Sequence, residues 1–339
     1  MPLSLVTLEH TTRYAYAQPV ALGEHRLMVR PRESFDQRLV DASLTITPEP
    51  CELRWLHDVF GNAVALAKFA GRARELQIVS TMAVEHAPLA VEDIRVERYA
   101  RRFPFTYASD DMPDLARSIE RGYHDPDRIV DEWARGFVRS RGATDTLDML
   151  SRMTAHVHDK FTYLARYEKG TQTPMETLAK ARGTCRDFAV LMIEAARALG
   201  FAARFVSGYL YNPERHEPLV GGGNTHAWVR IFLPGSGWIE FDPTNGIVGN
   251  RGLIRVAVAR DPYHAVPISG SWRGFPADDL GMKVGVDVHC RPAQERPRHA
   301  ETKATIAEPK APLVEAQLPA APTTAERSGA PALAVSKEN

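Results

Sequence analysis

The chain has 339 residues, of which 44% are hydrophobic and 25% charged, a composition typical of a globular protein with room for two domains and a large core. Its net charge is +0, which gives no electrostatic reason to expect nucleic acid or an acidic membrane as a partner. The three cysteines, Cys51, Cys185 and Cys290, fit neither a zinc site nor a disulfide framework. No apolar run approaches the roughly 20 residues of a transmembrane helix. The N-terminus lacks the basic and apolar regions of a secretory signal, so we expect a cytoplasmic location.

Residues 1–90 are predicted to form a β-rich N-terminal domain. Residues 6–16 mix β-branched and aromatic residues with polar ones, and the strand is expected to stop at Pro19. Residues 77–84 alternate between apolar and polar, and Gly61 and Asn62 mark a turn between two apolar stretches. Several short strands joined by turns favour a small antiparallel sandwich or barrel.

Helices are expected from residue 114 to about residue 161, because apolar residues recur at helical spacing in 127–138 and again in 146–157. The longest run of this kind follows Cys185, and Gly200 is expected to end it. Cys185 should therefore lie at a helix N-terminus, where unpaired backbone N–H groups and the helix dipole favour an anion.

Beyond this helix the spacing of apolar residues changes to that of β-strands, in the segments 203–211, 226–233 and 238–243. Helices followed by an antiparallel sheet define an α+β domain, which we assign to residues 91–290. Residues 283–289 alternate and are expected to form its last edge strand. Residues 291–339 are rich in Ala, Pro, Glu and Thr and are predicted to be a disordered tail.

Cys185, His226 and Asp242 are the predicted catalytic residues. The thiolate is the nucleophilic form of cysteine, and acyl transfer through it needs an imidazole to move the proton and a carboxylate to orient the imidazole. His226 begins a predicted strand and Asp242 ends the next one, so adjacent strands are able to supply both groups. A lone cysteine at a helix start is more often a small buried hydrophobic residue, so the prediction depends on these two partners.

The register of the two strands sets a condition on this triad. A four-residue turn at 234–237 would pair Leu233 with Trp238, and Asp242 would then face away from His226. The two side chains meet only if the loop has an odd number of residues or one strand carries a bulge.

Several blocks of the sequence resemble the bacterial transglutaminase-like family. They read GTCRDFA from Gly183, ALGFAARFVSGY from Ala198, HAW from His226, GW from Gly237 and FDPTN from Phe241. The front of the chain, with YAY from Tyr14, RPR from Arg30 and DVFGN from Asp58, is similar to the β-rich N-terminal domain of one branch of that family. Residues 260–270 are similar to that branch too, so the resemblance covers roughly residues 1–290.

The resemblance implies a papain-like core whose Cys-His-Asp triad matches Cys185, His226 and Asp242, and no cofactor. The family combines cross-linking enzymes with cysteine peptidases and amidases, so it does not name the reaction. We predict a thiol-dependent acyl-transfer enzyme that hydrolyses a peptide or protein substrate or another amide, because water is the default acceptor. The alternatives are a protein-glutamine γ-glutamyltransferase and a non-catalytic binding or scaffold protein. Calcium is expected only in an enzyme like the animal cross-linking ones, and the sequence has no acidic loop to hold it.

Other residues near the motifs have structural interpretations as well as functional ones. Trp228 and Trp238 are candidates to line a substrate cleft, although aromatic residues on adjacent strands more often belong to the core. Asp187 is expected to stabilise the first helical turn. His156 and His158 lie two apart in a predicted helix, so they do not share a face for a metal.

Two features bear on the expected reaction. The backbone N–H of Cys185 is the first candidate oxyanion donor, and an aromatic or amide side chain from residues 161–172 is the candidate for the second. The glycines at 221–223 form a loop before His226 that is a candidate lid. It lacks the Lys and Ser or Thr of a phosphate-binding loop, so a nucleotide is not expected.

Overall fold

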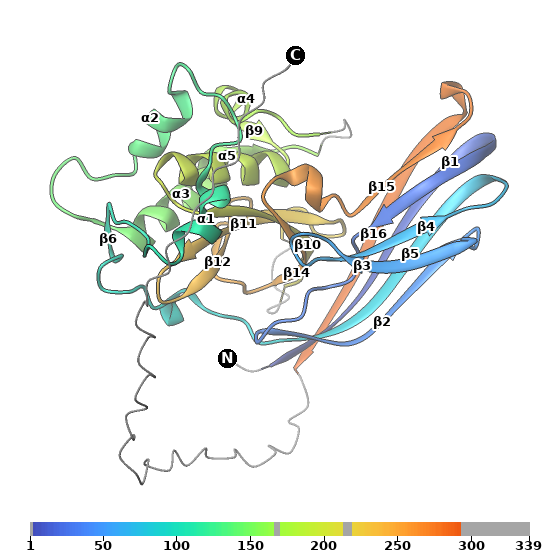
Figure 1. Cartoon of the computed structure of the whole chain (residues 1–339), viewed down its shortest axis with the longest axis horizontal. Helices are drawn as coiled ribbons and strands as arrows, with labels where there is room; N and C mark the ends of the chain where they lie inside the picture. The colour runs from blue at the N-terminus through green and yellow to red at the C-terminus, as the bar shows by residue number, and fades with distance from the viewer. Residues whose placement is uncertain (1–2, 166–169, 213–218, 293–339) are drawn as a thin grey trace, which may run out of the picture. The chain divides into compact units, whose positions relative to one another are not determined.

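The computed structural model describes residues 3–165, 170–212 and 219–292, which form two antiparallel sheets and a group of helices (Figure 1). Apart from its first two residues, the predicted tail at 291–339 lies outside the described residues. No helix in the described part of the chain is both long and apolar enough to cross a membrane.

The N-terminal region is β-rich, as predicted, and its seven strands form one antiparallel sheet centred on β1. The strands are β1 (Ser4–Leu27), β2 (Gln37–Thr47), β3 (Glu52–His57), β4 (Ala63–Lys68), β5 (Arg72–His86), β15 (Ile268–Arg273) and β16 (Asp279–Pro292). The first part of β1 pairs with β5 and β16, and its last part pairs with β4 and β15. The expected sandwich or barrel is therefore one connected sheet, because β1 is long enough to join its two ends.

Strand β1 continues through Pro19, where the sequence predicted its end. Its register with β5 shifts between Ala15 and Val20, so Pro19 lies in a bulged stretch in which a regular ladder hydrogen bond is not needed. The guanidinium of Arg72 donates to the carbonyl of Pro19 at 2.9 Å. Proline is thus accommodated within the strand at an irregularity of the pairing.

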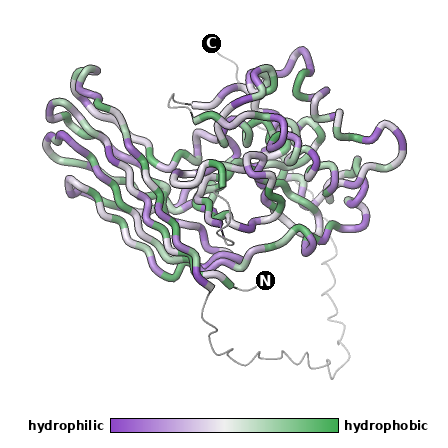
Figure 2. The backbone as a smooth tube through the Cα atoms, turned by 180° about the vertical axis from the view of Figure 1, so that it is seen from behind, coloured by the Kyte–Doolittle hydropathy of each residue, from purple (hydrophilic) through white to green (hydrophobic). Residues whose placement is uncertain are grey.

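Hydrophobic and hydrophilic residues alternate along the long strands of this sheet (Figure 2). The alternation gives the sheet an inner face that packs on the second sheet and an outer face that is more exposed. The inner contact contains the buried side chains Val6, Leu8, Met82 and Val84 from the N-terminal sheet and Tyr209, Tyr211, Ile254 and Val256 from the second sheet. The two sheets therefore share a hydrophobic core.

The second sheet has the order β13-β12-β11-β10-β14, and helices cover one of its faces (Figure 1). Its strands are β10 (Ala203–Leu210), β11 (His226–Leu233), β12 (Gly237–Asp242), β13 (Ile247–Val248) and β14 (Leu253–Ala259). The helices are α1 (Met112–Ile119), α2 (Ile129–Arg135), α3 (Thr146–Lys160), α4 (Pro174–Lys180) and α5 (Cys185–Ala198). The helix and strand types expected here are thus confirmed, and α5 packs on β10 and β11.

Short elements complete the described chain. They are the strands β6 (Arg102–Phe103), β7 (Thr144–Asp145), β8 (Thr162–Tyr163) and β9 (Arg182–Gly183) and the 3-10 turns η1 (Val91–Asp93), η2 (Pro262–Ala265) and η3 (Pro276–Asp278). Strands β8 and β9 pair in parallel beside the start of α5.

The last two strands return to the N-terminal sheet. Residues 283–289 were expected as an edge strand of the second domain, but β16 pairs with β1 from Ser4 to Tyr16, and β15 pairs with the far end of β1. Alternation predicts a strand without saying which sheet it joins, so the partner was not visible in the sequence. The proposed boundaries 1–90 and 91–290 stay a prediction, and strand pairing assigns 268–292 to the first sheet.

Candidate active site

Helix α5 begins at Cys185, so the sulfur lies at a helix N-terminus, as the sequence predicted. The N-cap Thr184 shares a capping box with Asp187, whose carboxylate accepts from the Thr184 N–H and hydroxyl, each at 2.9 Å. The other carboxylate oxygen of Asp187 accepts from the N–H of Gln172 at 2.7 Å. Gly183 leaves room for this turn, because a Cβ there would lie 2.9 Å from the Cβ of Asp187. Asp187 therefore stabilises the turn that carries Cys185.

Strands β11 and β12 bring His226 and Asp242 onto one face of the sheet. Leu233 pairs with Gly237, so the loop between the strands has three residues, 234–236. This odd number meets the condition set by the register. The Nε2 atom of His226 lies 2.8 Å from Oδ2 of Asp242.

The carboxylate of Asp242 is fully buried and has three donors around it. Besides His226, the N–H of Thr244 donates to Oδ1 and the Nδ2 of Asn245 donates to Oδ2, each at 2.9 Å. Burial would raise the pKa of Asp242, but the charge of His226 and the hydrogen bonds from these donors lower it below its usual value. Asp242 is therefore held as an anion in the protein interior.

The imidazole of His226 is buried and carries a positive charge at neutral pH. Burial would lower the pKa of His226, but Asp242 and Cys185 together raise it to about 10. Because Nε2 is bound to Asp242, Nδ1 is the nitrogen left to exchange a proton with Cys185. Nδ1 makes no hydrogen bond of ordinary geometry with any described residue. The structure thus brings Cys185, His226 and Asp242 together in one cluster.

Two further residues lie beside the cluster, Gly221 against Nδ1 of His226 and Tyr163 near Gly221 and Cys185. The parallel pairing of β8 with β9 places Tyr163 opposite Gly183, two positions before Cys185. A Cβ at Gly221 would lie 3.2 Å from Nδ1 and 3.7 Å from the hydroxyl of Tyr163. Burial and the neighbouring Cys185 raise the pKa of Tyr163, so its hydroxyl keeps its proton and can donate a hydrogen bond.

The two tryptophans proposed for a substrate cleft lie in different places. Trp228 is fully buried and stacks on His226, with 5.9 Å between the ring centroids and 24° between the planes. Trp238 lies four residues before Asp242, roughly 13 Å along the strand, and the guanidinium of Arg204 covers its ring at 4.1 Å. Trp228 therefore packs against the face of the imidazole, and a substrate contact by either tryptophan stays a prediction.

The two histidines of α3 serve different neighbours, as their spacing predicted. His156 packs against the rings of Trp133 and Phe137. The Nδ1 of His158 lies 2.9 Å from the carbonyl oxygen of Thr244, in the turn after β12. Within the described residues there is no group of three or more side chains placed to hold a metal ion.

Sequence reasoning did not assign roles to Tyr163, Asn245 or His158 individually. Asn245 had a detectable signal, because an Asn three positions after a strand-ending Asp is placed to hydrogen-bond within the turn. Tyr163 belongs to the 161–172 segment named for the second oxyanion donor, yet it reaches the site through the β8–β9 pairing, for which the sequence has no local signal.

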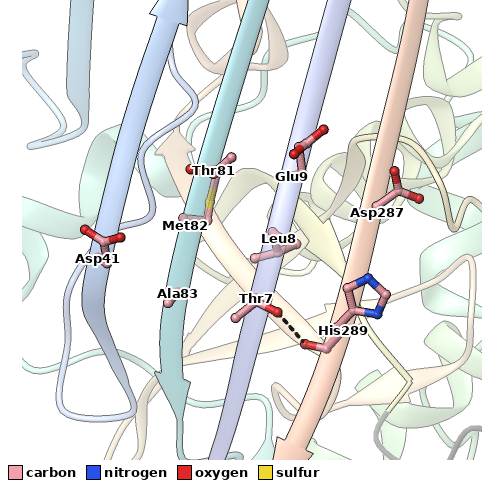
Figure 3. Close-up of a pocket in the computed structure, with 9 residues that line it drawn as sticks. All are labelled: Thr7, Leu8, Glu9, Asp41, Thr81, Met82, Ala83, Asp287 and His289. Carbon is pink, nitrogen blue, oxygen red and sulfur yellow. Dashed lines mark hydrogen bonds between the residues drawn. The ribbon is translucent and has the colours of Figure 1, made fainter.

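An open depression of about 470 Å³ lies apart from these residues, on the outer face of the N-terminal sheet (Figure 3). Strands β1, β2, β5 and β16 form it, and its lining includes Glu9, Asp41, Asp287 and His289. The hydroxyl of Thr7 donates to the carbonyl of His289 across it at 3.5 Å. None of the triad residues lines this depression.

The fold and the cluster define a class of α+β proteins in which a cysteine at the start of a helix faces a His–Asp pair on the neighbouring sheet. The family model of the transglutaminase-like superfamily matches residues 131–243, which contain all three residues of the cluster. The bacterial transglutaminase-like N-terminal region matches residues 6–85. The chain belongs to the transglutaminase-like superfamily.

Relatives of the chain support this membership. An uncharacterized protein of Mycobacterium tuberculosis is 30% identical over 281 residues, which are 77% of this chain and 85% of the relative. A protein-glutamine γ-glutamyltransferase of Pseudomonas aeruginosa is 35% identical over 102 residues, which are 28% of this chain and 15% of that protein. A crystal structure from Cytophaga hutchinsonii, provisionally described as a cysteine protease, has a TM-score of 0.64 at 18% identity and covers 87% of this chain and 93% of its own. That structure shows the shared fold.

Proposed function

We propose that the protein is a thiol-dependent acyl-transfer enzyme that hydrolyses an amide bond in a peptide or protein. One observation carries the proposal: a buried Asp242–His226 pair, whose carboxylate favours the charged imidazole, lies beside a cysteine at a helix N-terminus. A purely structural cluster has no need of a charged imidazole in the interior, because burial favours the neutral form. We propose the cytoplasm as its location.

Acylation begins from a Cys185 thiolate and a His226 imidazolium. The sulfur attacks the carbonyl carbon, a C–S bond forms, and the carbonyl electrons move to the oxygen. The backbone N–H of Cys185 and the hydroxyl of Tyr163 donate to this oxyanion in the proposed mechanism. When the intermediate collapses, the C–N bond breaks and Nδ1 of His226 gives its proton to the leaving amine.

Deacylation reverses the same proton path. The neutral His226 takes a proton from water at Nδ1, and the oxygen of that water attacks the thioester carbonyl. The C–S bond then breaks, Cys185 leaves as the thiolate, and the acid product departs. Asp242 stays ionised throughout and keeps the imidazole in one orientation.

The chain offers an internal control for the test. Cys51 is exposed, whereas Cys185 is 7% exposed, so ordinary thiol chemistry predicts faster alkylation of Cys51. We expect iodoacetamide at pH 6 to modify Cys185 first, because a thiolate paired with an imidazolium reacts where a free thiol does not. Incubation with a lysate should then leave an acyl group on Cys185, identified by its mass, and none on Cys185→Ala.

Two results would overturn the proposal. Slower alkylation of Cys185 than of Cys51 at pH 6 would contradict the proposed pairing of a Cys185 thiolate with the His226 imidazolium. Full biological activity in the Cys185→Ala variant would instead support a non-catalytic binding or scaffold role.

A second candidate function is protein-glutamine γ-glutamyl transfer, in which an amine replaces water as the acceptor. The match to the Pseudomonas aeruginosa protein of that name favours it. It predicts release of ammonia from a glutamine substrate together with Cys185-dependent incorporation of an amine probe. Ammonia release without incorporation, at saturating amine, would leave hydrolysis as the reaction.

A further inference from the structure

The side-chain amide of Asn245 joins two groups, Asp242 and the backbone of Val220. Its Nδ2 donates to Oδ2 of Asp242 at 2.9 Å and to the carbonyl of Val220 at 3.3 Å. Its Oδ1 accepts from the N–H of Val220 at 2.9 Å. An amide bonded in this way has one orientation, because exchanging its O and N would set donors against a donor and acceptors against acceptors.

Val220 precedes Gly221, the residue that lies against the imidazole of His226. Gly221 has a φ of +86°, in the left-handed region, and a Cβ there would lie 3.2 Å from Nδ1. Asn245 therefore acts on both ring nitrogens of His226. Asn245 is hydrogen-bonded to Asp242, which binds Nε2, and to the backbone of Val220, whose neighbour Gly221 lies against Nδ1.

The turn that carries Asn245 is fixed by elements outside the loop at 219–221. The N–H of Thr244 donates to Asp242, at the end of β12, and the carbonyl of Thr244 lies 2.9 Å from Nδ1 of His158 on α3. The position of Asn245 is thus set by α3 and β12. The amide transmits that position to the loop at 219–221.

We propose that Asn245 is a positioning residue for the reaction. It sets the direction of the Asp242 carboxylate, and it holds the backbone at 219–221 at the distance from His226 that lets Nδ1 exchange a proton with Cys185. This inference rests on the proposed function. Without the amide, Oδ2 of Asp242 loses its second donor and Val220 loses both hydrogen bonds to the turn.

Two substitutions distinguish this role from a purely structural one. In Asn245→Asp, a protonated carboxyl can donate to Asp242 and accept from Val220, as the amide does. Once ionised, it sets two carboxylates within hydrogen-bond distance of each other, where they repel. Asn245→Ala removes the contacts at every pH. The two variants therefore predict different pH profiles.

The measurement is the rate at which iodoacetamide modifies Cys185 in the full chain between pH 5 and pH 8.5, with Cys51 as the internal reference thiol. We expect Asn245→Ala to slow the reaction about tenfold at every pH, as the loss of a hydrogen bond to a charged group implies. We expect Asn245→Asp to be within about threefold of the parent protein at pH 5 and about thirtyfold slower at pH 8.

Asn224 provides the matched control, because it is exposed in the same loop and Asn224→Asp adds the same charge. We expect its rate to equal that of the parent protein throughout. Parallel pH profiles for Asn245→Asp and Asn245→Ala, or unchanged rates in both, would overturn the inference while leaving the function intact. If the parent protein itself alkylates Cys185 no faster than Cys51 at pH 6, the proposed function fails instead. Should Asn245→Ala not fold, the pH profile of Asn245→Asp alone decides the question. A rate difference from the parent protein that widens from pH 5 to pH 8 supports the inference, and a constant difference overturns it.

Discussion

Two groups of buried histidines differ in charge: the pair at the contact between the two sheets is neutral, and the histidine of the candidate site favours the positive form. At the contact between the two sheets, His10 and His86 are almost fully buried, and burial lowers the pKa of each to about 4. At the start of β11, His226 is equally buried, yet its pKa is raised to about 10. Burial alone therefore does not decide the charge of a histidine in this protein.

The difference lies in the partners of the rings. His10 is hydrogen-bonded to the hydroxyls of Tyr209 and Thr12 at 2.8 and 2.9 Å, and these neutral partners do not favour a charged ring. His86 is bonded to the hydroxyl of Tyr211 at 2.7 Å. For His86 the attraction of Asp36 is opposed by the nearby Arg255.

His226 instead bonds directly to the carboxylate of Asp242, whose other hydrogen-bond donors, Thr244 and Asn245, are uncharged. An ionised carboxylate at hydrogen-bond distance, together with the neighbouring Cys185, therefore reverses the effect of complete desolvation on the pKa of His226. The interface histidines bind hydroxyls of neighbouring side chains, and the histidine of the cluster is the one that transfers a proton in the proposed mechanism.

The largest expected effect comes from removing that carboxylate. In Asp242→Asn the environment of His226 becomes like that of His10, so we expect a neutral ring and a rate of acyl transfer lower by about 10³-fold or more. Alkylation of Cys185 by iodoacetamide at pH 6 should fall to the level of Cys51. Asp41→Asn, at an exposed site on the N-terminal sheet, is the control and should change neither rate. A high rate at pH 6 in Asp242→Asn would break the comparison.

A smaller effect concerns the two interface histidines and the stability of the fold. Above pH 6.5 the folded and unfolded states both hold these rings neutral. As the pH falls below 6.5, the unfolded chain binds protons that the folded one does not until about pH 4, so folding stability decreases. The loss reaches up to about 3 kcal/mol for each ring.

Urea unfolding at several pH values between 7 and 4.5 measures this loss. The slope of the free energy of unfolding against pH should decrease in His10→Gln and decrease again in the double variant with His86→Gln. The comparison with the parent protein separates the histidines from the carboxylates that titrate lower in the range. Identical slopes in all three proteins would mean that these rings are not neutral in the fold.

The smallest effect comes from the hydroxyls that hold the interface rings. Tyr209→Phe leaves Nδ1 of His10 without this partner, which should lower the free energy of unfolding by about 1–2 kcal/mol. Tyr211→Phe should do the same for His86 and serves as a matched variant. Urea unfolding at pH 7 gives the values, and alkylation of Cys185 should stay unchanged in both. A large loss of alkylation would show that the interface contributes directly to the cluster.

The sequence predicted the parts of the site that depend on local order. Helical spacing and Gly200 placed Cys185 at a helix start, because a helix is specified by residues within a few positions of one another. The spacing of His226 and Asp242 predicted that they meet only if the loop is odd or one strand carries a bulge, and the loop has three residues. Local reasoning was therefore sufficient to state the condition, and the structure supplied the answer.

Features that depend on distant contacts were not predictable in this way. Pro19 was expected to end a strand, but the bulged pairing with β5 accommodates it, and that pairing joins segments more than fifty residues apart. The return of β16 to β1 has the same origin. The contacts of Tyr163 and Asn245 also involve neighbours that only the folded chain brings close, so the types and positions of these two residues alone do not reveal them.

The pairing of Ser4 with Pro292 has a consequence for how the chain is made. Translation produces β1 before β16. The central strand of the N-terminal sheet therefore lacks this partner strand until translation has passed residue 279. At about 5–20 residues per second, this interval is of the order of tens of seconds. During that time one edge of β1 has no partner strand, and the helices and the second sheet are synthesised from the part of the chain between β1 and β16. A nascent chain arrested before residue 279 should therefore be a good substrate for chaperones that bind exposed strand edges.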